Sequence, residues 1–405
     1  MRAFMFTCLL VLGTSFLFAS QNRKVLIIGI DGTRSDAFVQ ANTPNIDGLL
    51  GNATFSYDSW HTGITISGPS WSTILTGVNW NKHGITDNSF TAPNFLQYPP
   101  LPTLAKQIKP NLNCSIVAEW DPLIDDITNA SWNRAVKALD GSTYPTADSA
   151  VIELQNPDLD LLFTYFDHVD LTGHSSQFIP TNALYISAIQ QVDTAVGQIL
   201  TALHNRPAYA TEDWLILVIT DHGGKSFFHG GNSYEERHIW WIANGSMVAA
   251  QQINKADPGT YNCNTNFVFN ATCVDTALMR QSPVQADIMV TALHYLIYDS
   301  GINPETKPEW DLDGKSWLVN ATAINDFDAD ENLAIYPNPS SGTFTLSGLN
   351  LTSNQSPVVE IFSADGRKVY SAVATQPNMV VDVSKLQKGV YILQTGITVK
   401  KLVLN

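Results

Sequence analysis

Residues 215–224 read Leu215-Ile-Leu-Val-Ile-Thr-Asp221-His222-Gly-Gly, an apolar run that ends in a carboxylate and an imidazole. A run without polar alternation is typical of a strand buried on both faces, as in a parallel sheet. Open α/β sheets bind their ligands in the crevice at the carboxyl ends of such strands. Alone, Asp221 could cap a turn and His222 could be a packed histidine, but other segments of the chain argue against that interpretation.

Two further segments repeat this arrangement. Lys24-Val-Leu-Ile-Ile-Gly-Ile runs into Asp31-Gly32, and the strand expected at Leu159–Phe166 runs into Asp167-His168-Val-Asp170-Leu-Thr-Gly173-His174. We expect Asp170 and His174 to flank a glycine turn at this third strand end. Four neighbours are expected to orient the ligands, as second partners do in metal sites: Arg34, Asp36, Asp167 and His168.

A candidate nucleophile lies between the first two of these segments. In Thr62-Gly-Ile-Thr-Ile-Ser67-Gly-Pro-Ser70-Trp71 an apolar segment enters a turn and then a helical pattern, which places Ser67 near a helix N-terminus. Backbone N–H groups there favour anions and would help an alkoxide form. Alternatively, Ser67 or Ser70 is only an N-cap. Asn88, further along, could donate its amide N–H to a bound oxyanion.

These segments, with His229 just downstream, supply three carboxylates and three imidazoles. The expected metal ligands are Asp31, Ser67, Asp170, His174, Asp221, His222 and His229. Such a set suffices for two divalent ions with Ser67 between them, an arrangement suited to phosphoryl transfer. Carboxylate and imidazole suit zinc, although manganese and iron accept the same ligands.

The rest of residues 21–320 alternates between helical and strand patterns. Helices are expected at Leu101–Lys109, Asp148–Leu154, Thr181–Asn205 and Pro283–Ile297, and further strands at Cys114–Trp120 and Arg237–Ala243. This order predicts an α/β fold with a mostly parallel central sheet flanked by helices. His61, His204, His238 and His294 lack a carboxylate at a strand end, so we do not expect them to be ligands.

The N-terminus and the cysteines indicate export. Met1–Ser20 has the charge, apolar stretch and small residues of a secretory signal peptide, and no later segment is expected to cross a membrane. In an oxidising compartment Cys263 and Cys273 are expected to form a disulfide. Cys114 is expected to be a buried thiol.

Composition changes at the acidic linker 321–332, and 333–405 reads as a small all-β sandwich. Its expected strands are Thr343–Leu346, Val358–Phe362, Lys368–Tyr370, Val380–Val383, Val390–Gln394 and Val399–Val403, with a hairpin turn at Ser363-Ala-Asp-Gly366. The whole chain has 22 Lys and Arg against 37 Asp and Glu, a net charge of -15. No basic patch is visible, which argues against binding of long nucleic acids. A small anionic substrate remains compatible with this charge, because local metal charge can dominate.

The motif order from Asp31-Gly-Thr-Arg-Ser-Asp to Trp310-Asp-Leu-Asp-Gly-Lys-Ser resembles the alkaline phosphatase superfamily, within it the nucleotide pyrophosphatase/phosphodiesterase-like branch. The resemblance implies one zinc on Asp31, Ser67, Asp221 and His222, and a second on Asp170, His174 and His229. It also implies a covalent phosphoseryl intermediate on Ser67 and a small phosphate-ester substrate.

Three features qualify this resemblance. Ser67-Gly-Pro-Ser-Trp71 resembles the sulfatase nucleophile motif, but Trp71 replaces the arginine associated with formylglycine formation. Thr65 is a rival nucleophile, since the phosphodiesterase branch uses threonine. Asn88 matches the oxyanion residue of that branch, and no arginine is clearly placed to clamp a dianionic monoester, which favours diesters or pyrophosphates. A sulfatase or phosphonate hydrolase of the same fold, and a non-catalytic cell-surface binding protein, are the alternatives.

The C-terminal part, from Tyr336-Pro-Asn-Pro to Lys400-Lys-Leu-Val, resembles the type A sorting domain of the type IX secretion system of Bacteroidota. This resemblance implies the type IX machinery as a partner and passage through the periplasm. The mature protein would be secreted or attached to the outer cell surface. An ordinary carbohydrate-binding or adhesion sandwich is the alternative.

Overall fold

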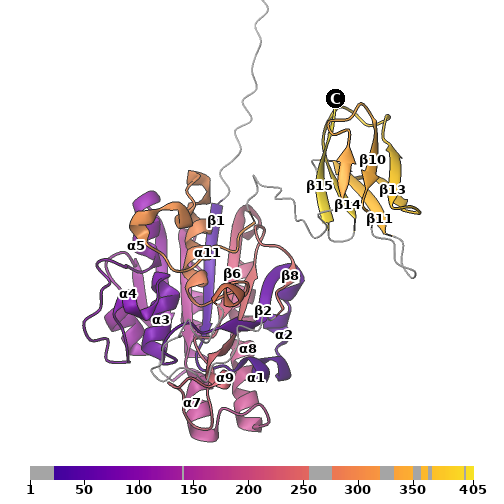
Figure 1. The fold of residues 1–405 in the computed structure, drawn as a ribbon. Helices are drawn as coiled ribbons and strands as arrows, with labels where there is room; N and C mark the ends of the chain where they lie inside the picture. Colours follow the sequence, from indigo (N-terminus) through magenta and orange to yellow (C-terminus); the bar gives the residue numbers. More distant parts are fainter. Residues whose placement is uncertain are drawn as a thin grey trace, which may run out of the picture. The chain divides into compact units, whose positions relative to one another are not determined.

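The computed structural model describes residues 22–138, 141–254, 276–319, 333–349, 357–363, 367–395 and 398–405. The expected signal peptide, the cysteine pair Cys263 and Cys273, and the linker 321–332 lie outside these ranges. The chain forms two compact units that divide between Leu318 and Val319. Figure 1 shows the ribbon of both units, coloured along the sequence.

The first unit is built on an eight-stranded sheet with the order β4-β3-β5-β1-β6-β7-β2-β8. Among its described strands only β7 runs against the others, pairing antiparallel with both β6 and β2. The α/β class with a mostly parallel sheet is therefore confirmed. The strands are β1 (Asn22–Ile30), β2 (Ala53–Trp60), β3 (Asn113–Ala118), β4 (Arg134–Lys137), β5 (Leu159–Phe166), β6 (Glu212–Ile219), β7 (His238–Asn244) and β8 (Gln251–Gln252).

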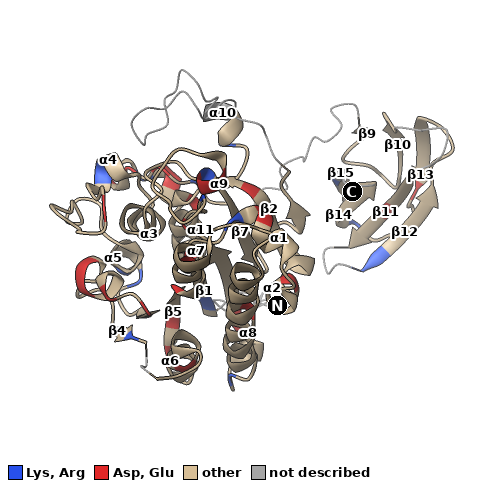
Figure 2. Cartoon of the chain, turned by 90° about the horizontal axis from the view of Figure 1, so that it is seen from below, with Lys and Arg blue, Asp and Glu red and all other residues tan. Residues whose placement is uncertain are grey.

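Helices cover both faces of this sheet (Figures 1 and 2). The apolar core on one face includes residues of α3, α5 and α11, and the core on the other includes residues of α1, α2, α6 and α8. In β1, Val25 and Ile27 belong to the first core, whereas Leu26, Ile28 and Ile30 belong to the second. Because strand side chains alternate between faces, a strand with a core on each side is apolar throughout.

The helices of this unit have the following bounds: α1 (Ser35–Gln40), α2 (Pro44–Asp47), α3 (Ser67–Thr76), α4 (Trp80–His83), α5 (Leu101–Ile108), α6 (Pro145–Glu153), α7 (His168–Ser176), α8 (Ala183–His204), α9 (Tyr234–Arg237), α10 (Thr276–Met279) and α11 (Ala286–Ile297). None of the helices in the described ranges combines the length and the apolarity that a membrane span requires.

The sheet brings three strand ends to one place. β1 is the middle strand of β5-β1-β6, and it pairs in parallel with both neighbours, Ile30 opposite Phe166 and Gly29 opposite Ile219. The residues that follow these strands therefore emerge side by side at the carboxyl edge. They are the segments that begin at Asp31, Asp167 and Thr220.

The second unit is all β. Its two sheets, β13-β10-β9 and β12-β11-β14-β15, share one apolar core that includes Phe344, Leu346, Ile361 and Leu393. All pairings within these sheets are antiparallel. The strands are β9 (Ala334–Tyr336), β10 (Thr343–Ser347), β11 (Val358–Ser363), β12 (Lys368–Val373), β13 (Asn378–Asp382), β14 (Gly389–Thr395) and β15 (Thr398–Leu404). The expected small all-β domain is confirmed; the centre of its expected hairpin turn, residues 364–366, lies outside the described residues.

Candidate metal centre

Asp31, Asp221 and His222 form a buried group at the ends of β1 and β6, which we call the inner cluster. All three side chains are essentially inaccessible to solvent. Asp31 Oδ2 accepts hydrogen bonds from the Tyr165 hydroxyl at 2.6 Å and from Trp71 Nε1 at 2.9 Å. Asp221 Oδ1 accepts from the backbone N–H groups of Gly32 and His222, at 3.0 and 2.9 Å.

The second oxygen of each carboxylate in the inner cluster accepts no hydrogen bond from the described residues. Asp31 Oδ1 and Asp221 Oδ2 are buried and have no hydrogen-bond partner among the described residues. They lie 3.6 and 3.2 Å from His222 Nε2. Ionised oxygens that are buried without donors are costly, so this pair indicates a place for a cation.

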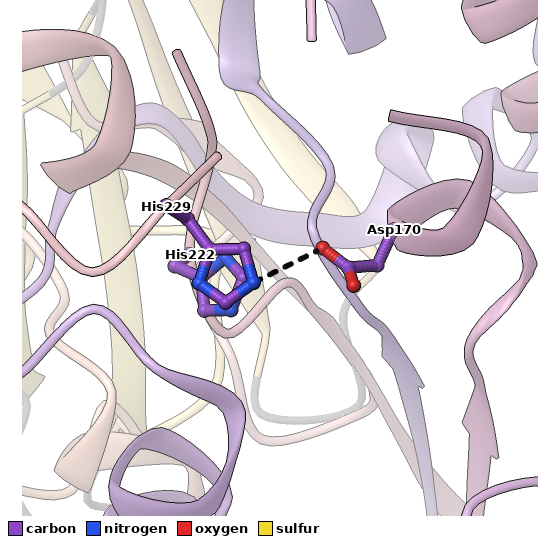
Figure 3. A group of neighbouring side chains, drawn as sticks. All are labelled: Asp170, His222 and His229. Carbon is purple, nitrogen blue, oxygen red and sulfur yellow. Dashed lines mark ion pairs between the residues drawn. The ribbon is translucent and has the colours of Figure 1, made fainter. Parts of the chain in front are cut away.

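Asp170, His174 and His229 form a second group, the outer cluster, which is less buried. Asp170 and His174 lie on α7 at positions i and i+4, one helical turn apart, so the expected glycine turn between them is wrong. Asp170 Oδ2 lies 3.3 Å from His174 Nε2. Asp170 Oδ1 lies 3.6 Å from His229 Nε2, and Figure 3 shows this pair with His222 beside it. Asp170 Oδ1 is a third buried oxygen without a hydrogen-bond partner among the described residues.

The two clusters are adjacent. The imidazole rings of His222 and His229 are stacked with their centres 3.9 Å apart. Within the described residues, ligand atoms of Asp31, Asp221 and His222 lie close enough to hold one ion, as do those of Asp170, His222 and His229. The geometry therefore joins His222 to both groups, whereas the family resemblance assigns it to one.

All three imidazoles present the same nitrogen to the site. Nδ1 of His222, His174 and His229 lies 2.8, 2.8 and 2.9 Å from the carbonyl oxygens of Gly223, Phe227 and Thr65, respectively. A carbonyl only accepts, so each Nδ1 carries the proton and each Nε2 presents a lone pair, the arrangement of metal-binding histidines.

Two of these lone pairs face each other. Nε2 of His174 and Nε2 of His229 lie 3.0 Å apart. Neither neutral ring has a proton left to donate at that position. A proton or a metal ion must therefore stabilise the pair.

The ionisation of the metal-free site reflects the same crowding. Burial, followed by repulsion from Asp170, raises the pKa of Asp31 to about 7. Burial and repulsion from Asp31 raise the pKa of Asp221 well above its usual range, and burial lowers the pKa of His222 well below. Hydrogen bonding to Asp170 raises the pKa of His174. Divalent cations would neutralise the charge that burial disfavours.

Ser67 and Thr65 differ in what their hydroxyls contact. Ser67 is the first residue of α3, and its Oγ lies 3.4 Å from His222 Nε2. The buried Thr65 donates its hydroxyl to the Gly231 carbonyl at 2.8 Å. Of the two, the Ser67 hydroxyl is the one that lies against a ligand of the inner cluster.

Asn88 lies next to Ser67 but holds a contact that we did not expect. Its Oδ1 accepts the backbone N–H of Gly68 at 2.7 Å. The Gly68 N–H, at the start of α3, is therefore already bonded to the Asn88 side chain. The amide nitrogen of Asn88, on the other branch of the same side chain, is the donor left to meet a substrate oxygen.

The expected supporting residues are placed unequally. Arg34 holds Asp36 through two hydrogen bonds and donates to the carbonyls of Phe178 and Gly224, which lie on two segments of the outer cluster. Asp167, just before α7, lies beside Glu119; burial and then this carboxyl group raise its pKa to about 8. His168 is exposed.

Several contacts of the site were not predicted. Tyr165 and Trp71 hold Asp31, and Gln285 donates to the Asp221 carbonyl. Tyr165 is the last residue but one of β5, five positions before the predicted ligand Asp170, and this position is the sequence feature that could have singled it out. The four histidines that we did not expect to be ligands lie outside both clusters. Of these, His61 contacts Ser70 at 2.8 Å, His238 contacts Asp58 at 2.7 Å and His294 contacts Ser316 at 2.8 Å.

The fold and the family match define a protein of the alkaline phosphatase superfamily, whose members are metal-dependent, and the two clusters of candidate ligands suit such a protein. The family model for type I phosphodiesterases/nucleotide pyrophosphatases matches residues 25–257, more than half of the chain. The chain belongs to this family. A second model, the secretion system C-terminal sorting domain, matches residues 334–405 and indicates secretion or surface attachment through the type IX system.

Similar proteins include a pyrophosphatase/phosphodiesterase of Schizosaccharomyces pombe, itself uncharacterized, 28% identical over 222 residues, which cover 49% of this chain and 44% of that protein. The 2,3-bisphosphoglycerate-independent phosphoglycerate mutase of Staphylococcus aureus is 33% identical over 82 residues, 20% of this chain and 14% of the mutase. The chain thus spans less than half the length of these curated relatives.

Solved structures share the fold. Murine ectonucleotide pyrophosphatase/phosphodiesterase 5, as an inactive variant in complex with AMP, has a TM-score of 0.51 at 15% identity, covering 68% of this chain and 95% of that one. The phosphonate monoester hydrolase of Agrobacterium radiobacter has a TM-score of 0.50 at 13% identity, covering 95% and 89%.

Proposed function

We propose that this protein hydrolyses small phosphate esters, with diesters or pyrophosphates preferred, using two divalent metal ions, most simply zinc. One observation carries the proposal: the lone pairs of His174 and His229 face each other at 3.0 Å, beside a buried oxygen of Asp170 that has no hydrogen-bond partner among the described residues. Without a cation, the facing lone pairs and the unpartnered oxygen are unfavourable. A bound cation would accept all of them as ligands and make the arrangement favourable. When bound, the ions would supply Lewis-acid stabilisation of the substrate and leaving oxygens.

The residues of the chain would divide the work as follows. Ser67 loses its hydroxyl proton to solvent and Oγ attacks the phosphorus; the P–O bond to the leaving group breaks, the leaving oxygen takes up a proton from solvent, and a phosphoserine forms. Water then cleaves the phosphoserine, releasing phosphate or a phosphate monoester and restoring the hydroxyl. His222, 3.4 Å from Oγ, stays neutral because burial lowers its pKa, and the Asn88 amide holds a non-bridging oxygen.

The local cations favour a substrate with one negative charge on the reacting phosphate. Arg34 is held by Asp36 and by the carbonyl oxygens of Phe178 and Gly224, which argues against its clamping a dianionic phosphate monoester. Trp71, where a sulfatase would carry arginine, is buried and donates to Asp31, which argues against sulfate esters.

We further propose that residues 1–20 are a signal peptide removed on export, in an organism of the Bacteroidota. The sorting unit would direct passage from the periplasm to the outside, and the enzyme domain would end near residue 320. Substrates would then be extracellular phosphate esters. AMP in the murine relative makes nucleotide esters the first natural compounds to assay.

The test is a panel of aryl phosphate diester, aryl phosphate monoester, aryl sulfate and nucleotide diester, assayed with zinc. Wild-type protein is expected to hydrolyse the diesters fastest. Ser67→Ala should lower kcat by at least about a thousandfold, as for loss of a covalent nucleophile. Thr65→Val, which keeps the shape of the side chain, should keep most of the activity, and mass spectrometry of quenched reactions should locate phosphate on Ser67.

Each alternative gives a different outcome. Faster hydrolysis of sulfate than of phosphate esters would indicate a sulfatase. Loss of activity in Thr65→Val with retention in Ser67→Ala would make Thr65 the nucleophile. Hydrolysis of no ester in the panel by zinc-loaded protein would support the non-catalytic binding protein.

A further inference from the structure

Phe178 is a buried aromatic residue that lies between the two segments of the outer cluster. Gly173 of α7 and Gly224 of the loop after β6 both lie against its ring. A Cβ atom at Gly173 would lie 2.5 Å from Phe178 Cζ, and a Cβ at Gly224 would lie 2.7 Å from Phe178 Cδ2. Both glycines are therefore needed because the ring occupies the space of their side chains.

The same ring contacts both histidines of the outer cluster. Its centre lies 5.2 Å from the His174 ring and 6.1 Å from the His229 ring, edge to face in each case. His174 belongs to α7, whereas His229 belongs to the loop after β6. The ring thus packs against an imidazole from each segment.

The backbone of Phe178 joins the two segments as well. Its N–H donates to the Ser226 carbonyl at 2.6 Å, and its own carbonyl accepts from Arg34 Nη1 at 2.8 Å. Gln177 and Ser226, on the two sides of this bridge, have φ values of 91° and 56°, although neither is glycine. Strained backbone persists only where surrounding contacts hold it, and it concentrates at functional sites.

We propose that Phe178 is a positioning residue for the outer metal ion. Its ring sets the spacing between α7 and the loop 223–229, and so holds Asp170 and His174 at the right distance from His229. The inner carboxylates, Asp31 and Asp221, follow β1 and β6, so their placement does not depend on this spacing. This inference rests on the two-metal site proposed above.

The inner and outer ions should therefore respond differently to loss of the ring. Phe178→Ala removes the spacer, and we expect the zinc affinity of the outer site to fall by about 10- to 100-fold, the usual effect of losing a residue that orients metal ligands. The affinity of the inner site should stay within about threefold of wild type. Phe178→Leu keeps apolar bulk, so its outer-site zinc affinity should lie between those of wild type and Phe178→Ala. It also provides a test if Phe178→Ala does not fold.

Gly173→Ala supplies the reciprocal change. Alone, its methyl group would displace the ring, and we expect a similar loss at the outer site. Combined with Phe178→Ala, the methyl group meets no ring, so the double variant should lose less than the sum of the two single effects. Ile199→Ala, a cavity-forming change in the buried face of α8, is the control for general loss of packing.

The measurement is zinc content after dialysis, with chelator competition for the affinity of each ion, and a melting temperature for each variant. Two ions in wild type and Ile199→Ala, with one weakened ion in Phe178→Ala, would support the role of Phe178. Two unweakened ions in Phe178→Ala and Phe178→Leu would overturn it and leave the proposed function intact. A single ion in wild type would overturn the two-metal site, and this inference with it.

Discussion

At the scale of single residues, the inner cluster brings buried carboxylates together, and a bound cation would relieve their repulsion. Asp31 is buried with a pKa of about 7 against an ordinary value of 3.8, so the folded metal-free protein binds a proton that the unfolded chain releases. That contribution is present at low pH and is lost as the pH rises from about 4 through about 7. Buried His222, whose pKa is lowered, changes stability in the opposite direction below about pH 6.5.

Asp31→Asn separates these effects, because the amide does not titrate. Without metal, the variant should unfold with a free energy close to wild type at or below about pH 4 and exceed it near pH 8, where the wild-type carboxylate is charged. With zinc the order should reverse, since a ligand is lost. Chemical denaturation at both pH values, with chelator or with zinc, measures this. A metal-free difference that does not grow with pH would contradict the raised pKa.

Trp71 tests the support of the same carboxylate. Trp71→Phe keeps an aromatic ring but removes the N–H that reaches Asp31 Oδ2. Leaving a buried acceptor short of a donor costs about 1–3 kcal/mol, and we expect inner-site zinc affinity to fall by about tenfold or more. Trp241→Phe is the matched control, because Trp241 is equally buried and its Nε1 has no partner among the described residues. Equal affinities in both variants would show that the Asp31 contact is not needed.

At the scale of elements, the close fit between the end of β1 and helix α7 should be sensitive to a single methyl group. Gly32 has φ +65°, and a Cβ there would lie 2.7 and 2.8 Å from Cβ and Cα of Asp170. Gly32→Ala should therefore displace α7 and lower the zinc affinity of the outer site. It should also lower the free energy of unfolding by more than the roughly 1–2 kcal/mol that a non-glycine residue in the left-handed conformation costs. Gly301→Ala, with φ +71° and open space around it, should cost only that amount. Unfolding free energies and zinc affinities of both variants check this, and equal effects would contradict it.

At this scale, the sequence predicts the elements whose pattern is local, that is, contained in the element itself. β1, β5 and β6 were predicted because a strand between two cores is apolar along its length. β2 (Ala53–Trp60) was not: Thr54, Ser56 and Asp58 alternate with its apolar residues, so it lacks the continuous apolar run that marks the other three strands. Gly173 was interpreted as a turn residue, yet it lies inside α7 and is required by the ring of Phe178. No local pattern reveals that requirement.

The site shows the same division. Asp31, Asp221 and His222 could be predicted because each follows a strand end, and the parallel sheet then brings such ends together. Tyr165 reaches Asp31 across 134 positions of the chain, and this contact exists only after β5 and β1 have paired. Ligand types are thus visible in the sequence, whereas the groups that orient the ligands depend on tertiary packing.

At the scale of the whole molecule, the two units have separate hydrophobic cores, and each core is made of residues from its own unit. A chain ending near residue 320 should therefore fold, keep the zinc content of the mature protein and hydrolyse the preferred ester with unchanged kcat/KM. Its melting transition should coincide with one of two transitions in the longer chain, because separate cores unfold independently. Calorimetry and steady-state kinetics on both forms measure this.

In cells that carry the type IX system, the truncated chain should accumulate in the periplasm while the full chain reaches the outside. Loss of activity or of the melting transition on truncation would instead mean that the sorting unit contributes to the catalytic fold.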